Sequence, residues 1–263
     1  MTVRSENSRH NTLRAIYHIN ARMSLLHAVQ GIDISRCFEY TEAYRQIRHS
    51  TPNMSVLDVG SYRSPFPAFL ASKGYHVSIV DLDPAVGQQL KWISKTLGSN
   101  TSIGVHITDV TALPFLENTF HVVTCISTLE HIPGDGDGAA MREIARVLRV
   151  GGACFISVPY STRAREGRWR KWFQRWFDLD MALSRLVEPS GLSLVRTGFV
   201  MGGTVGRLAD AWYRLPALLR HAFSWSHVLL FPRAFEMDEA NKNDARVIWL
   251  LLEKREDAST SNS

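Results

Sequence analysis

Short apolar runs that end in glycine or an acidic residue alternate with helix-forming stretches along the middle of the chain. Residues 56–59 form a largely apolar run that Gly60 ends, which predicts a strand buried on both faces. Residues 65–72 predict a helix with proline in its first turn. Residues 77–80 predict a second strand with Asp81 at its tip. A strand, a glycine turn, a helix and a second strand with an acidic tip are the parts of a nucleotide-binding βαβ unit.

The same alternation continues towards the end of the chain and predicts an α/β fold. Further strands are predicted at residues 102–108, 120–126, 154–158, 192–200 and 246–252. Further helices are predicted at residues 35–49, 85–97, 139–148 and 178–188, the third of them closed by the glycines at 151 and 152. A looser apolar stripe between Leu13 and Val29 predicts an N-terminal helix that Gly31 ends.

The turn after the first predicted strand contains one glycine, Gly60. Dinucleotide folds use G-x-G-x-x-G because the backbone must come close to a pyrophosphate, so this turn is poor for NAD or FAD. A cofactor with a carboxylate and an amine, such as S-adenosylmethionine (SAM), demands less of the turn. The sequence here resembles the class I SAM-dependent methyltransferases, and more narrowly the type 11 group with motif D-x-G-x-G-x-G. The resemblance covers roughly residues 39–200 and 247–254.

The resemblance implies a Rossmann-like α/β fold with a seven-stranded, mostly parallel sheet, an antiparallel last strand and helices on both faces. The string from Glu143 to Gly152 is similar to the family's E-x-x-R-V-L-K-P-G-G, which belongs to the scaffold. The implied domains are N-terminal helices covering the pocket (1–50), a SAM-binding core (51–203 and 244–254), an apolar lid insertion between the last two strands (204–243) and a flexible tail (255–263).

The resemblance also implies which residues contact SAM. Asp81 holds the ribose, Leu82 packs on the adenine, and Asp109 accepts the adenine amino group. Two of the implied contacts have a structural alternative: the sequence favours a packing role for Tyr40, whereas for Asp109 it favours the cofactor role over a turn aspartate. The full set of implied cofactor contacts is Tyr40, Asp58, Gly60, Ser61, Arg63, Ser64, Asp81, Leu82, Asp109, Val110 and Ser127.

Residues 127–133 resemble the family's LEHI segment, which faces the transferred methyl group. His131 is the candidate catalytic base, because its ordinary pKa lies near 6.5. The alternative is a structural histidine that bonds the backbone under the next helix. In some relatives a glutamate three residues before Glu130 completes a metal triad with the glutamate and histidine. That position is Ser127 here, so no metal is expected.

Three other segments allow more than one interpretation. Residues 163–176 interleave arginine and tryptophan, which suits a phosphorylated or lipid-linked acceptor, a membrane surface, or a plain surface helix. The apolar residues within 207–231 predict a lid, a membrane-facing patch, or packing against the N-terminal helices. Residues 134–138, with two aspartates, predict a solvated turn rather than a cation loop.

Composition says more about the compartment of the protein than about the reaction that it catalyses. The net charge of +5 permits contact with phosphates without indicating a particular partner. Three cysteines without C-x-x-C spacing predict a reducing compartment, the cytoplasm, with membrane association only through residues 163–176 or 207–231. No apolar run reaches the roughly eighteen residues of a membrane span.

The resemblance implies methyl transfer from SAM to a small-molecule, saccharide or lipid-linked acceptor, on oxygen, by in-line displacement. The Asn-Pro-Pro-Tyr motif of amino-group nucleic-acid methyltransferases is absent after residue 126, so no nucleic acid is expected as a partner. A catalytically silent methyltransferase fold, acting as a binding or scaffold protein, stays open because Tyr62 and Ser64 occupy positions of motif glycines. The same positions disfavour a nicotinamide enzyme.

Overall fold

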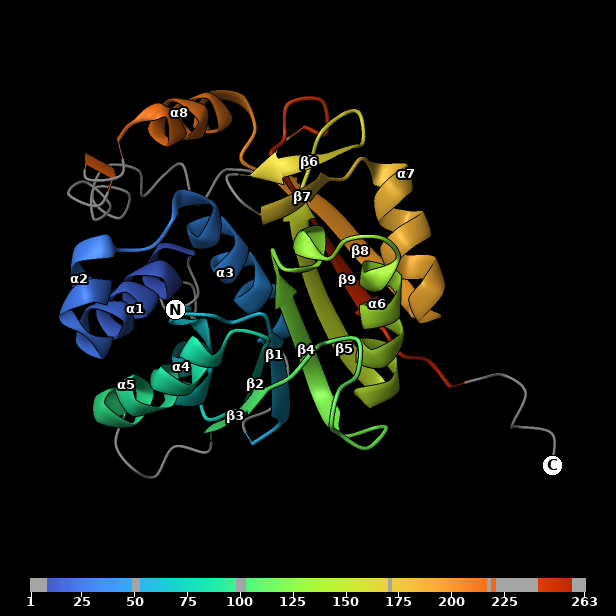
Figure 1. The fold of residues 1–263 in the computed structure, drawn as a ribbon, viewed down its shortest axis with the longest axis horizontal. Helices are drawn as coiled ribbons and strands as arrows, with labels where there is room; N and C mark the ends of the chain where they lie inside the picture. The colour runs from blue at the N-terminus through green and yellow to red at the C-terminus, as the bar shows by residue number, and fades with distance from the viewer. Residues whose placement is uncertain are drawn as a thin grey trace, which may run out of the picture.

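A computed structural model describes residues 9–48, 53–97, 103–169, 172–216, 219–220 and 241–256. Within these residues, seven strands form one sheet in the order β3-β2-β1-β4-β5-β9-β8 (Figure 1). Strand β9 runs antiparallel to both of its neighbours, and the remaining strands share one direction. The predicted mostly parallel sheet with an antiparallel last strand is confirmed. The strands are β1 (Ser55–Val59), β2 (His76–Asp81), β3 (Ile103–Ile107), β4 (Phe120–Ile126), β5 (Leu148–Pro159), β8 (Ser193–Val200) and β9 (Val247–Glu253).

Helices cover both faces of this sheet, as predicted (Figure 1). Successive residues of β1 show why, because Val56 packs in the hydrophobic core beneath the N-terminal helices and Leu57 packs in the core beneath α6. The described helices are α1 (Arg9–Met23), α2 (Leu25–Gln30), α3 (Ile34–Ile47), α4 (Phe66–Ser72), α5 (Gly87–Leu97), α6 (Gly136–Val147), α7 (Leu179–Ala182) and α8 (Gly203–Arg214). Short single turns lie at Pro84–Val86, Leu129–His131, Leu183–Val187 and Glu188–Ser190.

The structure corrects three local predictions. The N-terminal stripe is two helices, because Ser24 breaks it with extended backbone and caps α2 through His27 N. Helix α6 ends at Val147, and the glycines at 151 and 152 lie inside β5 instead of capping the helix. The surface-helix reading of residues 163–176 is wrong: β6 (Arg165–Trp169) and β7 (Trp172–Trp176) form an antiparallel hairpin. In that hairpin Arg165 pairs with Trp176 across the two strands.

The predicted lid insertion is described only in part. Helix α8 begins it, whereas residues 217–218 and 221–240 lie outside the described residues, as do residues 257–263 of the predicted tail. No helix among the described residues is long and apolar enough to span a lipid bilayer.

Candidate active site

Two cavities adjoin at the carboxyl ends of the parallel strands. The smaller, of about 390 Å³, is bordered by the loop after β1 and by the N-terminal helices. The larger, of about 790 Å³, is bordered by the loop after β4, the β6–β7 hairpin and α8. Asp33 and Arg36 line both cavities, so the two spaces meet at the start of α3. Ligand sites in open α/β sheets occur at this edge of the sheet.

The loop after β1, residues 60–64 and called the glycine loop below, bends sharply where it passes close to Thr128. Gly60 has φ +74°, and a Cβ placed on it would lie 2.0 Å from Oγ1 of Thr128. Only glycine fits both the left-handed backbone and the contact with Thr128. Tyr62 also has positive φ, at 41°, and its backbone N–H donates to Oδ2 of Asp81 at 2.7 Å. The loop is therefore held to the tip of β2.

A buried carboxylate, Asp58, supports this loop from below. The hydroxyl of Thr124 donates to it at 2.5 Å, and the hydroxyl of Ser61 donates to its other oxygen. Burial raises the pKa of Asp58 to about 6, although these two hydrogen bonds act in the opposite direction. Asp58, Gly60, Ser61 and Ser64 all line the smaller cavity.

Two further predicted contacts, Tyr40 and Arg63, line the smaller cavity from different sides. Tyr40 stacks on Phe66 with ring centroids 5.1 Å apart, so it is a packing residue as well as a wall of the cavity. The Nε atom of Arg63 is buried and has no hydrogen-bond partner among the described residues. An unpaired buried guanidinium donor fits a carboxylate such as that of the methionine end of SAM.

The predicted adenosine contacts lie at the ends of β2 and β3, outside the lining of either cavity. Leu82 is 68% exposed, whereas Val110 is buried. Asp109 accepts from the backbone and hydroxyl of Thr111 through one oxygen, both at 2.9 Å. The turn role of Asp109 is therefore realised, and its second carboxylate oxygen is not used by that turn.

A network not foreseen from the sequence joins the two cavities through Glu39 of α3. Its carboxylate accepts from Arg36 at 2.6 Å and from the hydroxyl of Ser157 at 2.9 Å. The hydroxyl of Ser127 bonds the same oxygen as Ser157, and Ser127 lines the larger cavity, not the smaller one. The only sequence signal was the Glu39-Tyr40 pair, since Ser157 lies 118 positions away from Glu39.

His131 faces the larger cavity with a defined ring orientation. Its Nδ1 lies 2.8 Å from the carbonyl oxygen of Phe173, and a carbonyl only accepts, so Nδ1 carries the proton. The other nitrogen, Nε2, lies 3.8 Å from Oε1 of Glu130. Burial lowers the pKa of His131, as does the nearby Arg36, so the ring is neutral near pH 7 with an unprotonated Nε2.

Glu130 is buried beside His131 and lines the same cavity. Burial raises its pKa to about 8, and its Oε2 atom has no partner among the described residues. In the described part of the chain, no three side chains of the metal-binding types gather at one point. The position that completes a metal triad in some relatives is Ser127, whose hydroxyl is bonded to Glu39.

The hairpin and α8 also line the larger cavity. Arg165 lies over the Trp176 ring at 4.5 Å, which is a cation–π contact. The Tyr213 hydroxyl of α8 bonds the carboxylate of Asp33, and Arg246 pairs with Asp210 at 2.7 Å. The wall of this cavity is therefore both aromatic and cationic.

Part of the chain is similar in sequence to known methyltransferases. A family model described as Methyltransferase domain matches residues 57–156, from β1 into β5. A ubiquinone biosynthesis O-methyltransferase of Xanthomonas campestris is 30% identical over 122 residues, which cover 46% of this chain and 49% of that protein. The chain therefore spans about half the length of the curated relatives that it matches.

Two solved structures show the same fold at low identity. The cyclase SpnF superposes with a TM-score of 0.62 at 16% identity, covering 94% of this chain and 96% of that one. The 1,6-didemethyltoxoflavin-N1-methyltransferase of Burkholderia thailandensis, solved with its substrate and S-adenosylhomocysteine, gives 0.58 at 16% identity, covering 93% and 88%. One of these relatives is a cyclase and the other a methyltransferase, so the likeness establishes the fold alone.

Proposed function

We propose that this chain, which carries a class I SAM-dependent methyltransferase domain, transfers a methyl group from SAM to a small-molecule acceptor. The observation that carries the proposal is the meeting of the two cavities at Asp33 and Arg36. A cofactor in the smaller cavity and an acceptor in the larger one then face each other across a short boundary. Holding two reactants in line is the main task of such an enzyme, because the sulfonium of SAM already activates the methyl group.

The residues of the smaller cavity suit the methionine part of SAM. The unpaired Nε of Arg63 is the proposed partner of the carboxylate, and Gly60 allows the chain to approach the ligand. The adenosine part is assigned to the ends of β2 and β3, where Asp81 and Asp109 offer carboxylates and Leu82 offers an exposed apolar surface. The N-terminal helices cover the smaller cavity through His27 and Tyr40.

His131 is the proposed base for an acceptor hydroxyl. Its Nε2 is unprotonated near neutral pH and faces the larger cavity, so it accepts the proton that an oxygen loses when it is methylated. The names of the matched relatives, which are O-methyltransferases, favour oxygen as the methylated atom. Trp176 and Arg165, which line the same cavity, favour an acceptor with a flat ring and an acidic group, whether free, on a saccharide or lipid-linked.

Membrane contact through residues 163–176 or 207–231 stays a prediction. Only part of that basic segment is available to a membrane, because Arg175 is buried in the protein. Of the apolar segment, residues 221–231 lie outside the described residues. Helix α8 and its C-cap residue Leu215 are described parts of the proposed lid, with Leu208 and Leu215 exposed.

The decisive experiment asks whether the purified protein binds SAM. Mass spectrometry of the isolated chain is expected to reveal retained SAM or S-adenosylhomocysteine, and calorimetry is expected to give saturable SAM binding and none for NADH. Methyl transfer is then measured with isotope-labelled SAM and a panel of catechols with and without a carboxylate. SAM binding without transfer to any acceptor would favour the silent-scaffold alternative, and absence of SAM binding would overturn the proposal.

A further inference from the structure

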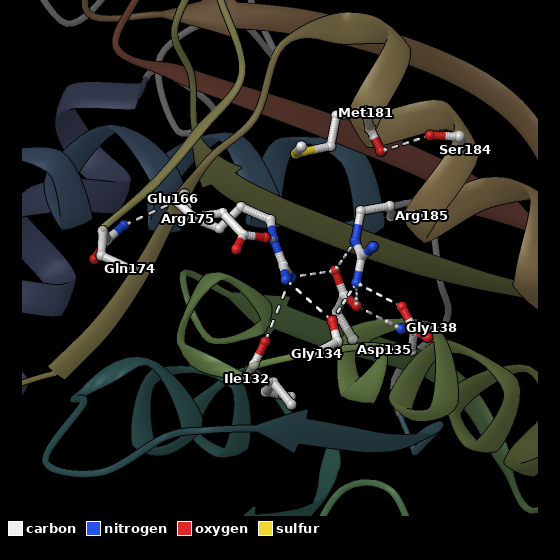
Figure 2. A network of polar contacts seen from close by, with 11 residues as sticks. Ile132, Gly134, Asp135, Gly138, Glu166, Gln174, Arg175, Met181, Ser184 and Arg185 are labelled. Atoms are coloured by element: carbon white, nitrogen blue, oxygen red, sulfur yellow. Dashed lines mark hydrogen bonds and ion pairs between the residues drawn. The ribbon is translucent and has the colours of Figure 1, made fainter. Parts of the chain in front are cut away.

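An ion-pair cluster lies behind the larger cavity, at the start of α6. Asp137 is completely buried, and its carboxylate accepts from Arg175 at 2.6 Å and from two nitrogens of Arg185 at 2.6 and 2.8 Å. Arg175 and Arg185 also both donate to the carbonyl of Gly134, and Figure 2 shows the two guanidinium groups converging on that residue. Arg175 is itself only 1% exposed, which is rare for an arginine.

Arg175 connects the hairpin to the segment that follows His131. Its Nη1 donates to the carbonyl of Ile132 at 3.4 Å, and its Nη2 donates to the carbonyl of Gly134 at 3.1 Å (Figure 2). Its Nε pairs with Glu166 on the neighbouring strand at 2.8 Å. One side chain of β7 therefore holds the loop on the C-terminal side of His131.

The backbone of β7 contacts His131 itself. Phe173, two residues before Arg175, supplies the carbonyl that accepts the Nδ1 proton of His131. Among the described residues, the hairpin backbone meets the seven-stranded sheet only at its base, where Phe177 bonds to residues 159 and 161. The position of the Phe173 carbonyl thus depends on side-chain contacts made farther along β7, where Arg175 donates to Ile132, Asp137 and Gly134.

Stability alone explains this cluster poorly. A buried ion pair usually contributes little more than well-packed apolar side chains of the same size would. The cluster matters more for the position of the proton on His131 than for stability. Without a fixed acceptor at Nδ1, the neutral ring of His131 is free to carry its proton on Nε2.

We propose that Arg175 is a positioning residue that holds the Phe173 carbonyl on Nδ1 of His131 and so keeps Nε2 of His131 unprotonated towards the larger cavity. The inference rests on the proposed function, in which His131 is the base. It assigns a functional consequence to the arginine-rich segment without requiring that segment to touch a ligand.

The test is the tautomer of His131, read by ¹H–¹⁵N NMR of the histidine side chains in the full chain at pH 7 to 8. His131→Gln identifies the signals of His131. The wild-type protein is expected to show the form protonated at Nδ1. Arg175→Met keeps an unbranched apolar stem without the guanidinium group and leaves Asp137 paired with Arg185. This variant is expected to lose the Nδ1-protonated signal and to lower the pKa of His131 further, because the hydrogen bond to the Phe173 carbonyl favours the protonated ring.

Two matched variants complete the test. Glu166→Gln removes the negative charge of the half-exposed partner of Arg175 and leaves the bonds to Asp137, Ile132 and Gly134 in place, so it is expected to keep the wild-type tautomer. Arg175→Lys keeps the charge opposite Asp137 with fewer donors and is expected to restore the tautomer in part. It also serves as the test if Arg175→Met does not fold. A folded Arg175→Met or, failing that, Arg175→Lys with the wild-type tautomer and pKa would overturn the proposal.

Failure of the proposed function has a different signature. If His131→Gln transfers methyl groups at the wild-type rate while Arg175→Met still changes the tautomer, then Arg175 positions a histidine that is not the base. If His131→Gln abolishes transfer and Arg175→Met leaves the tautomer unchanged, then the base assignment stands and the role of Arg175 does not.

Discussion

The carboxylate of Asp81 accepts a hydrogen bond of 2.7 Å from the backbone N–H of Tyr62, across the gap between β2 and the glycine loop. Its other oxygen accepts from the backbone N–H of Asp83 at 2.8 Å. Both oxygens thus shape the rim of the proposed cofactor site, and each keeps further lone pairs for a ribose hydroxyl. Asp81 therefore both holds the loop and offers an acceptor to the ligand.

Asp81→Asn is expected to weaken SAM binding about tenfold or more. The amide loses the charge and one of the two acceptor atoms, and hydrogen bonds to charged groups contribute roughly 1.5–3 kcal/mol each. Calorimetric titration with SAM measures the loss. Asp83→Asn is the matched control, because Asp83 is exposed and its side chain accepts from Ala85 N without contacting the glycine loop. An Asp81→Asn protein with wild-type affinity would remove Asp81 from the cofactor site.

Gly60→Ala is expected to lower the free energy of unfolding by more than about 2 kcal/mol, the sum of a left-handed backbone cost and a steric cost. Gly151→Ala separates the two costs, since Gly151 has φ +73° against +74° for Gly60, yet a Cβ added at Gly151 would meet no described atom within 4 Å. The control should show only the backbone cost.

Adding Thr128→Ala to Gly60→Ala should recover little, because the Cβ of Thr128 would still lie 2.7 Å away. Urea unfolding of the four proteins decides, and equal losses at positions 60 and 151 would show that the contact with Thr128 is unimportant.

The local parts of this architecture could be predicted from the sequence. Apolar runs, turn glycines and strand-end aspartates depend on neighbouring residues, which is why β1, β2 and the loop at Gly60 were found close to their observed bounds. The family resemblance supplied the seven-stranded, mostly parallel sheet and its antiparallel last strand.

The parts that failed depend on partners far along the chain. Residues 134–138 suggested a solvated turn, yet Asp137 is buried because Arg175 and Arg185, 38 and 48 positions away, pair with it. The other aspartate of that segment, Asp135, is exposed as the pattern suggested. The arginine and tryptophan residues of 163–176 suggested a surface helix as one alternative, because the pairing of Arg165 with Trp176 across two strands is not visible in their order along the chain.

Glu130→Gln is expected to change how stability depends on pH. The pKa of Glu130 is about 8 in the folded protein, above its ordinary value of 4.5, so the folded state keeps a proton that the unfolded state releases. Wild-type stability from this group is therefore full below about pH 4.5 and falls as the pH rises to about 8, by up to about 1.4 kcal/mol per pH unit. The neutral glutamine lacks this loss, so the variant should gain on the wild type as the pH rises.

Urea unfolding between pH 5 and pH 9 measures the effect. Glu143→Gln is the control, because the hydrogen bond from Arg146 lowers the pKa of Glu143 and its stabilisation is fully present above about pH 4.5, so its difference from wild type should be constant between pH 5 and pH 9. A constant difference between Glu130→Gln and wild type at every pH would show that Glu130 is ionised in the folded protein throughout this range.

His131→Gln is expected to reduce the turnover number by a factor of about 10² to 10⁴, the usual contribution of a general base. SAM affinity should not change, because His131 lines the larger cavity and not the smaller one. In the wild type the lowered pKa of His131 keeps the ring neutral at pH 7, so the rate should rise with pH below about 6.5 and be level above it. The variant should lose that rise.

His76→Gln, on the exposed start of β2, is the matched control and should keep the wild-type profile. Steady-state rates between pH 5 and pH 9 with one acceptor test both statements, and a His131→Gln enzyme that keeps the acidic limb would assign that limb to another group.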